Sequence, residues 1–586
     1  MLKIIPQPPQ LRRKNKKRRK NKNSAMVKKI FKLFHSEVGG MHQAAAILGL
    51  FTLMSQVLAL FRDRILASYF GATHSLDLYY ASFRIPDFIF ASVASLVSIS
   101  VLIPFLSDRL ENKKDGTKKF LDSIFTVFFS AILIVAAVAF FLMPYIAGFV
   151  FPGISDPDSL SKVIFLSRIL LLQPICLGVS NMLGVITQIK KRFFLYAVSP
   201  ILYNVSIIFG IIFLYPFFGI TGVVYGVVIG GVLHFLIQVP FVIKQGMLPV
   251  FTFKIDFKEV WRVVKISVPR TLTLSTNTLE QIFITAFAST LTAGSITIFS
   301  FASNLQSVPL AIVGISYTLA AFPTLSACFA KGQKEEFMKH IVVAARHIIF
   351  WSFPITALFI VLRAQIVRVI LGSGSFNWQD TRLTAACLAL FTISLFAQSL
   401  EMLFIRSYYA AGKTRKPLLI NLAGSVVTIL SPFLLLKLFA SSESFRIFFE
   451  SLFKVAGIKG TEVMMLPFGY TIGTLVTLVM LWIIFERDFR GFTKKTAMIL
   501  VHSLGAGVIG AFFAYVGLNI FSMVFSRTAT MGVFLQGFCA GIIGIIVTIL
   551  IYILLDTKEL GEVWGAVASK VNKNNLIVSE PDTIEG

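Results

Sequence analysis

Long apolar segments recur along almost the whole chain and are separated by short polar loops. Each segment is long enough for an α-helix to cross about 30 Å of hydrocarbon, which takes about 20 residues. The pattern predicts an all-α polytopic membrane protein with about fourteen transmembrane helices. These helices are expected near residues 42–61, 78–106, 120–147, 162–187, 194–215, 219–243, 264–291, 296–325, 344–371, 383–411, 417–439, 463–485, 496–521 and 531–555.

The composition agrees with lipid as the solvent. Of the 586 residues, 56% are hydrophobic and 14% are charged, whereas soluble domains carry about 25% charged residues. The four cysteines are scattered, without the paired spacing of a zinc site or a disulfide framework. No nucleophile, nucleotide-binding or metalloprotease motif is present. We therefore expect a transporter rather than an enzyme, with no catalytic residues and no metal site.

The net charge of +27 is unevenly placed along the chain. Nine Lys and Arg lie between Arg12 and Lys22 without interleaved aromatic residues, which favours a lipid-contacting tail over nucleic-acid binding. Basic loops then alternate with loops that lack Lys and Arg, such as 151–160 and 372–380. The positive-inside rule places the basic loops and both termini in the cytoplasm. Loop 440–462 contains three Lys and Arg, and we expect it to form an amphipathic hairpin on the outer face.

An internal repeat divides the chain. The segment from Pro200 to Asn204 recurs 217 residues later as Pro417 to Asn421, each time after a basic loop. Two parallel six-helix lobes would enclose a substrate cavity suited to alternating access. The expected divisions are a basic tail (1–40), an N-lobe (41–243), a C-lobe (244–485), two further helices (486–555) and a C-terminal tail (556–586).

Charged residues within spans are the candidate functional residues, because burying a charge in hydrocarbon is expensive. Arg62, Asp77 and Arg84 lie in the first helical hairpin, and the seven-residue spacing places the last two on one helix face. Guanidinium groups match phosphate oxygens. The alternative is that the charges reach water and pair with one another. We favour function for these three and the alternative for Arg64 and Asp87.

Deeper charges are sparse. Arg168, Arg270 and Arg406 lie within about two turns of predicted cytoplasmic ends, where their side chains could reach water. Glu280 and Glu401 lie farther inside their spans. Each could hold a coupling sodium ion or proton, or could make a polar contact between helices, and the sequence leaves these alternatives open.

At the first hairpin the sequence becomes specific. The segment SQVLALFRDRILASYFGATHSLDLYYASFRIPDFI (55–89) resembles the MurJ/MviN family of lipid II flippases, as do KRFFLYAVSPILYN (191–204) and RSYYAAGKTRKP (406–417). The resemblance extends over the first eleven helices. It implies the fold of the multidrug/oligosaccharidyl-lipid/polysaccharide exporter superfamily, a bacterial inner-membrane location, and a groove for a polyprenyl tail on the last two helices.

The departures from the family concern its cavity arginines. By alignment of the motif they fall at Gln56, Phe90 and Asn304, whereas Arg62 is kept and Asp77 matches. The helix-7 acid that binds sodium in some members falls at Ile284, one turn from Glu280. Arg84 and Arg270 could compensate for the missing arginines.

The expected function is therefore a flippase that moves lipid II from the cytoplasmic to the outer leaflet by alternating access. Its substrate-binding candidates are Arg62, Asp77, Arg84 and Arg270, and Glu280 and Glu401 are candidates for ion coupling. Membrane lipids and cell-wall synthesis proteins are the other expected partners. The alternatives are a transporter of another polyprenyl-linked glycan or of a small molecule, and a scaffold for cell-wall enzymes that transports nothing.

Overall fold

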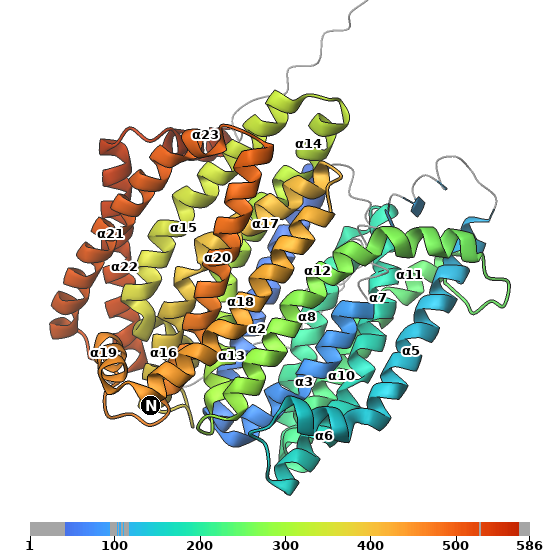
Figure 1. Cartoon of the computed structure of the whole chain (residues 1–586), viewed down its shortest axis with the longest axis horizontal. Helices are drawn as coiled ribbons and strands as arrows, with labels where there is room; N and C mark the ends of the chain where they lie inside the picture. Colours follow the sequence, from blue (N-terminus) through green and yellow to red (C-terminus); the bar gives the residue numbers. More distant parts are fainter. Residues whose placement is uncertain are drawn as a thin grey trace, which may run out of the picture. The chain divides into compact units, whose positions relative to one another are not determined.

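A computed structural model describes residues 41–93, 102–103, 105–106, 109, 116–526 and 529–572. Within these ranges the side chains of residues 41–47, 269–270 and 566–572 are not described. The predicted basic tail at 1–40 therefore lies outside the described residues. All the regular structure in the described part of the chain is helical (Figure 1).

The helices of the first half follow one another in chain order. They are α2 (Met41–Phe70), α3 (His74–Val93), α5 (Thr117–Val150), α6 (Pro157–Leu170), α7 (Leu172–Ile189), α8 (Phe193–Phe209), the π-helical η2 (Gly210–Leu214), α9 (Tyr215–Phe218), α10 (Ile220–Leu236), α11 (Val239–Lys244) and α12 (Phe257–Ser289).

The second half contains longer helices. They are α13 (Ser295–Leu310), the π-helical η3 (Ala311–Ile315), α14 (Ser316–Ala330), α15 (Lys334–Leu371), α16 (Trp378–Ile393), α17 (Leu395–Ala410), α18 (Arg415–Ser441), α19 (Glu443–Phe453), the 3₁₀ turn η4 (Thr461–Met464), α20 (Met465–Asp488), α21 (Phe492–Val524), α22 (Thr530–Leu554) and α23 (Lys558–Asn572). The last helix lies in the predicted C-terminal tail, and α19 lies in the predicted hairpin at 440–462.

Helices occupy every one of the fourteen predicted spans, but not all of them are strongly apolar. Ten described segments are long and apolar enough to cross a membrane, and α16 and α17 form an eleventh that is bent by 41°. The other three predicted spans correspond to α2, α3 and α12, which do not meet this test over their described residues. In α12, residues 271–289 include nine Ser, Thr, Asn and Gln. The exact count of fourteen therefore stays a prediction.

The chain forms two compact units that do not follow helix order. The first contains Met1–Arg62, Ile85–Met143 and Phe165–Thr271, and the second contains Asp63–Arg84, Pro144–Ile164 and Leu272–Gly586. The boundaries fall inside α2, α3, α5, α6 and α12, so each of these helices belongs partly to each unit. The division into two six-helix lobes and two further helices stays a prediction from the repeat.

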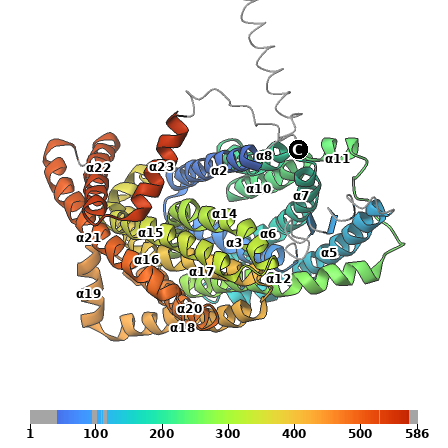
Figure 2. The ribbon, with the colours of Figure 1, turned by 90° about the horizontal axis from the view of Figure 1, so that it is seen from above.

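In the second unit α15 is the central helix. It packs against α14, α16, α17, α21 and α22, and the last two also pack tightly against each other. Figures 1 and 2 both draw α21 and α22 beside α15. The two helices outside the sequence repeat are thus attached to the chain mainly through one helix of the second repeat.

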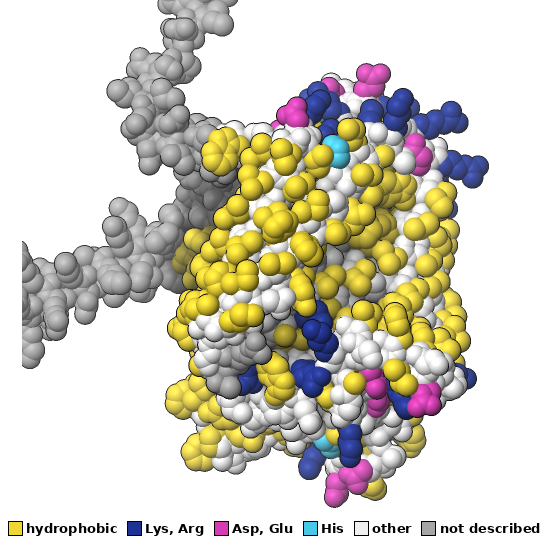
Figure 3. Space-filling view, turned by 90° about the vertical axis from the view of Figure 1, so that its left-hand side faces the viewer, with side chains coloured by type: hydrophobic (Ala, Val, Ile, Leu, Met, Phe, Trp, Pro, Cys, Tyr) yellow, Lys and Arg dark blue, Asp and Glu magenta, His cyan; other side chains and the backbone are white. Residues whose placement is uncertain are grey.

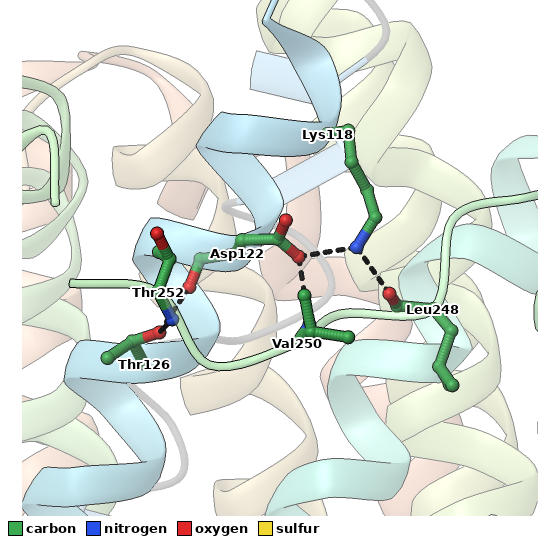
Figure 4. A network of polar contacts seen from close by, with 6 residues as sticks. All are labelled: Lys118, Asp122, Thr126, Leu248, Val250 and Thr252. Carbon is green, nitrogen blue, oxygen red and sulfur yellow. Dashed lines mark hydrogen bonds and ion pairs between the residues drawn. The ribbon is translucent and has the colours of Figure 1, made fainter. Parts of the chain in front are cut away.

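In the first unit α10 packs against α7 and α8, and an extended segment is fastened along α5. The Asp122 carboxylate of α5 accepts from Lys118 Nζ at 2.6 Å and from the Val250 amide at 2.8 Å (Figure 4). The Thr252 amide donates to Thr126 Oγ1 at 3.0 Å. The same Lys118 ammonium also donates to the carbonyl of Leu248. These bonds satisfy the polar backbone of the segment that leads into α12.

Small residues allow α18 and α20 to approach closely. A Cβ placed on Gly473 of α20 would overlap the backbone and side chain of Thr428 in α18, and one on Gly424 of α18 would overlap Thr477 of α20. Without water between them, helices in membranes associate largely through such close packing.

We predict that Gly473→Ala destabilises the protein. The added methyl group overlaps Thr428 and should lower the free energy of unfolding by about 1–3 kcal/mol. Gly505→Ala in α21 is the matched control, because no atom lies within 4 Å of its Cβ position, and it should be neutral or gain up to about 1 kcal/mol. Thermal unfolding of both variants in detergent tests the difference, and an equal unfolding temperature for both would contradict the close packing.

Candidate functional site

The Asp77 side chain of α3 caps the start of another helix. Its carboxylate accepts from the Gly294 amide at 2.6 Å, from the Thr297 amide at 2.8 Å and from Thr297 Oγ1 at 2.7 Å. Asp77 is 5% exposed. An acid at a helix N-terminus satisfies free backbone amides and meets the positive end of the helix dipole. Asp77 thus performs for α13 the role of an N-cap residue, from a helix about 220 residues away in sequence.

Further contacts attach the turn between α2 and α3 to α15 and α16. Arg64 Nη1 donates to the carbonyls of Val369 and Ile370 in the last turn of α15, where a cation is favourable. The Ser375 amide, in the connection between α15 and α16, donates to the Ser68 carbonyl at 2.9 Å, and the Ala72 amide donates to Asp380 Oδ2 of α16 at 3.5 Å. Residues 63–84 are therefore held by hydrogen bonds to three helices of the second unit.

Gly71 makes the close approach at this turn possible. It has φ +64°, and a Cβ there would lie 2.7 Å from the carbonyl oxygen of Ser375. A left-handed backbone next to another backbone favours glycine. The position is thus constrained both by its conformation and by its neighbour.

Two more polar contacts join the hairpin to α13. Asn304 Nδ2 donates to Asp63 Oδ2 at 2.9 Å, and Arg84 Nη2 lies 3.5 Å from Ser300 Oγ. Asn304 is one of the three departures from the family's arginines, and here its neutral amide binds the acid that follows Arg62 in α2. Asp63 is 2% exposed and was not among the predicted site residues.

The Arg62 side chain makes a hydrogen bond within the first unit. Its Nη1 donates to Asn204 Oδ1 at 3.1 Å, and Asn204 Nδ2 donates to Ser55 Oγ at 3.3 Å. Asn204 was missed as a site residue, although it ends one copy of the sequence repeat. Arg62 and Arg84 belong to different units, so the joint cationic face predicted from the sequence stays a prediction.

The other predicted positions lie in the same two helices or are not fully described. Gln56 and Phe90 are partly buried residues of the first unit. Arg270 lies in α12, but its side chain is outside the described residues. The structure therefore places Asp63 beside Asn304 of α13 and Arg84 beside Ser300 of the same helix. It does not test a substrate-binding role for any of these residues.

A second polar group lies inside the second unit, where α12, α17, α18 and α20 meet. Glu280 of α12 is 9% exposed and accepts a hydrogen bond from Ser425 Oγ of α18. Glu401 of α17 lies close enough to Glu280 for the ionised forms of the two carboxyl groups to repel each other. Two carboxylates in an apolar interior repel each other unless a proton or a cation is held between them.

Asn421 lies one turn before Ser425 on α18. It is 4% exposed, and its Oδ1 atom accepts no hydrogen bond within the described structure. A buried carbonyl oxygen without a donor is an available cation ligand. Asn421 ends the second copy of the repeat, so the sequence signal that marks Asn204 marks it as well. No group of three or more His, Cys, Asp or Glu suited to a metal ion occurs among the described residues.

Comparison with known proteins identifies one family. The sequence profile of the family described as lipid II flippase MurJ matches residues 66–539. A probable lipid II flippase MurJ of Buchnera aphidicola subsp. Acyrthosiphon pisum (strain APS) is 28% identical over 394 residues, covering 66% of this chain and 76% of the relative. The lipid II flippase MurJ of Burkholderia cenocepacia is 25% identical over 396 residues, covering 66% and 77%.

Solved structures give the same fold. A lipid II flippase MurJ in an inward closed conformation matches with a TM-score of 0.68 and 21% identity, covering 87% of this chain and all (100%) of that one. An inward-facing multidrug transporter of the MATE family matches with a TM-score of 0.62 and 15% identity, covering 77% and 99%. These matches confirm the predicted all-helical transporter fold.

We predict that Asp77→Ala destabilises the folded protein. It removes three hydrogen bonds to a carboxylate and leaves buried amides of α13 unsatisfied, which should cost on the order of 2–4 kcal/mol. Asp158→Ala is the control, because this exposed acid of the first turn of α6 makes no hydrogen bond through its side chain in the described structure. Thermal unfolding should separate the two variants. An unchanged unfolding temperature for Asp77→Ala, together with lost transport, would instead favour the substrate-binding role.

Proposed function

This chain belongs to the lipid II flippase MurJ family, and we propose that it moves lipid II from the cytoplasmic to the outer leaflet by alternating access. The match of the family profile to residues 66–539 carries the proposal. The protein is a multi-pass membrane transporter and not an enzyme.

The division of helices between units supports alternating access. Residues 63–84 are bound to α13, α15 and α16, whereas the same two helices continue into the first unit at Arg62 and Ile85. If the units move relative to each other, α2 and α3 have to bend at these boundaries. The bonds that hold the hairpin are hydrogen bonds between polar groups, which water can replace when one side opens.

We assign phosphate recognition to the arginines near the boundaries between the two units. The lipid II head group contains a pyrophosphate, and guanidinium groups bind phosphate oxygens in pairs. Arg62 donates to the amide oxygen of Asn204, and Arg84 lies beside the Ser300 hydroxyl. Arg270 would add a third cation from α12.

The orientation follows from the basic loops. We propose that both termini face the cytoplasm of a bacterial cell and that the protein lies in the inner membrane. With this orientation the turn between α2 and α3 faces outward, and its contacts close the outer side. Contacts with cell-wall synthesis proteins would then be made at either surface.

Glu280 and Glu401 are proposed to couple transport to a monovalent cation, either sodium or a proton. The carboxylates, the Ser425 hydroxyl and the free Asn421 Oδ1 are oxygen ligands that suit either. Binding would remove the repulsion between the two carboxylates, so it would favour the arrangement of α12, α17 and α18 that brings them together.

We expect Arg62→Ala to slow flipping of lipid II in reconstituted vesicles by about 10- to 100-fold, the loss of one charge-assisted contact to phosphate. Arg62→Lys should keep part of the rate, since it retains the charge but not the paired geometry.

Arg64→Ala is the matched control for Arg62→Ala. Its guanidinium binds carbonyls of α15, so its loss should lower the unfolding temperature while the folded protein still flips lipid II. Rates are compared per folded protein. Equal flipping by wild type and Arg62→Ala would remove Arg62 from the mechanism.

Glu280→Gln should remove the response of flipping to an imposed cation gradient. A coupling free energy of about 1–3 kcal/mol corresponds to a loss of about 5- to 150-fold. Separate sodium and pH gradients across the vesicle membrane identify the ion, and Glu443→Gln, at an exposed acid of α19, is the control. A full response in the Glu280→Gln variant to both gradients would refute the coupling role.

A further inference from the structure

A basic cavity lies where the start of α15 meets the connection between α20 and α21. It has a volume of about 680 Å³. Five cations line it: Lys334, Lys339 and Arg346 from α15, Arg490 from the connection, and Lys495 from α21. All of these residues belong to the second unit.

The cavity keeps a positive charge after its internal ion pairs are counted. Glu335 and Glu336 are its two acidic lining residues, so five cations and two acids leave a formal charge of +3. Glu336 pairs with Lys339 at 3.4 Å. Arg346 is bound by Glu559 of α23, which lies outside the lining and lowers the formal charge of the group to +2. No acidic partner of Arg490 or Lys495 occurs within the described structure.

An apolar surface adjoins these cations. Val343 belongs to the cavity wall and is 42% exposed, and Met498, one turn beyond Lys495 on α21, is 70% exposed. Val501 continues this strip and is 66% exposed. In the face drawn in Figure 3, Lys and Arg side chains gather together with Asp and Glu at the upper end, and a broad hydrophobic surface extends below them.

A ligand that fits must be anionic at one end and apolar at the other. A solvated basic loop would account for cations that determine topology, but not for a cavity that joins cations of two helices to a lipid-exposed strip. Basic pockets between transmembrane helices are suited to anionic lipid head groups. We propose that this cavity binds the phosphate of an anionic membrane phospholipid, with its acyl chains along Val343, Met498 and Val501.

The site would stabilise the attachment of α21 to α15. The cations come from both helices, and like charges repel when nothing lies between them. A bound phosphate reverses that repulsion and joins the two helices. The site is distinct from the proposed transport residues, because it includes none of Arg62, Arg84, Glu280 and Glu401. If no phospholipid binds in this cavity, the flippase proposal is unaffected.

Native mass spectrometry of the purified full-length protein tests the site, with phosphatidylglycerol and phosphatidylcholine as probes. Arg490→Gln combined with Lys495→Gln should weaken phosphatidylglycerol binding by about thirty-fold, since each basic residue near an anionic lipid is worth about 1 kcal/mol. The control is Arg487→Gln combined with Lys494→Gln, which removes the same charge at exposed positions outside the cavity. It should bind as the wild type does.

Other outcomes would overturn the proposal. Equal weakening in both double variants would mean a diffuse charge effect, and equal binding of phosphatidylcholine would exclude recognition of a net negative charge. Displacement of the lipid by an equal concentration of inorganic phosphate would indicate a site for free anions. If the first double variant does not fold, Lys495→Glu alone, at an exposed position, should still abolish preferential binding of phosphatidylglycerol, and retained preference would refute the site.

Discussion

The three hydrogen bonds that Asp77 accepts from the start of α13 fix the position of the first hairpin in the second unit. The first amides of a helix have no partners of their own, and within a membrane no bulk water replaces them. A carboxylate from α3 satisfies these amides and is itself stabilised by them. Once α3 is fixed in this way, Asp63 meets Asn304, and Arg64 meets the last carbonyls of α15. The charged turn is thus part of the second unit, although α2 begins in the first.

This arrangement reconciles stability with movement. The described hydrogen bonds that hold residues 63–84 on α13, α15 and α16 add to apolar contacts, such as that of the Tyr80 ring with Phe301 of α13 and the burial of Leu66 and Leu76. The hydrogen bonds of the hairpin contribute little net free energy when water can replace them, so entry of water would weaken this part of the attachment. Contacts that are stable without water and weaken when water enters would suit the proposed alternating access.

The sequence predicted the helices well because an apolar period and its length are local properties. It predicted less about the charges. The substrate-binding role of Asp77 stays a prediction, and the cap that Asp77 makes on α13 could not be predicted, because its partners lie about 220 residues away and no local pattern indicates a cap made by another helix. Asn204 was within reach of sequence reasoning, because it ends one copy of the repeat that Asn421 ends in the other. Arg64 was expected to reach water and to pair with other charges, whereas in the structure its guanidinium donates to backbone carbonyls of α15.

The departures from the family's arginines gain a physical meaning from Asn304. An arginine there would form an ion pair with Asp63, whereas the amide binds the same acid without cancelling its charge. Gln56 and Phe90 likewise supply no positive charge. The proposed transport site therefore contains fewer arginines than the family pattern. Each remaining arginine then has to supply a larger share of the positive charge that binds a pyrophosphate. Arg62 is held by the neutral amide of Asn204, which orients the guanidinium and adds no negative charge of its own.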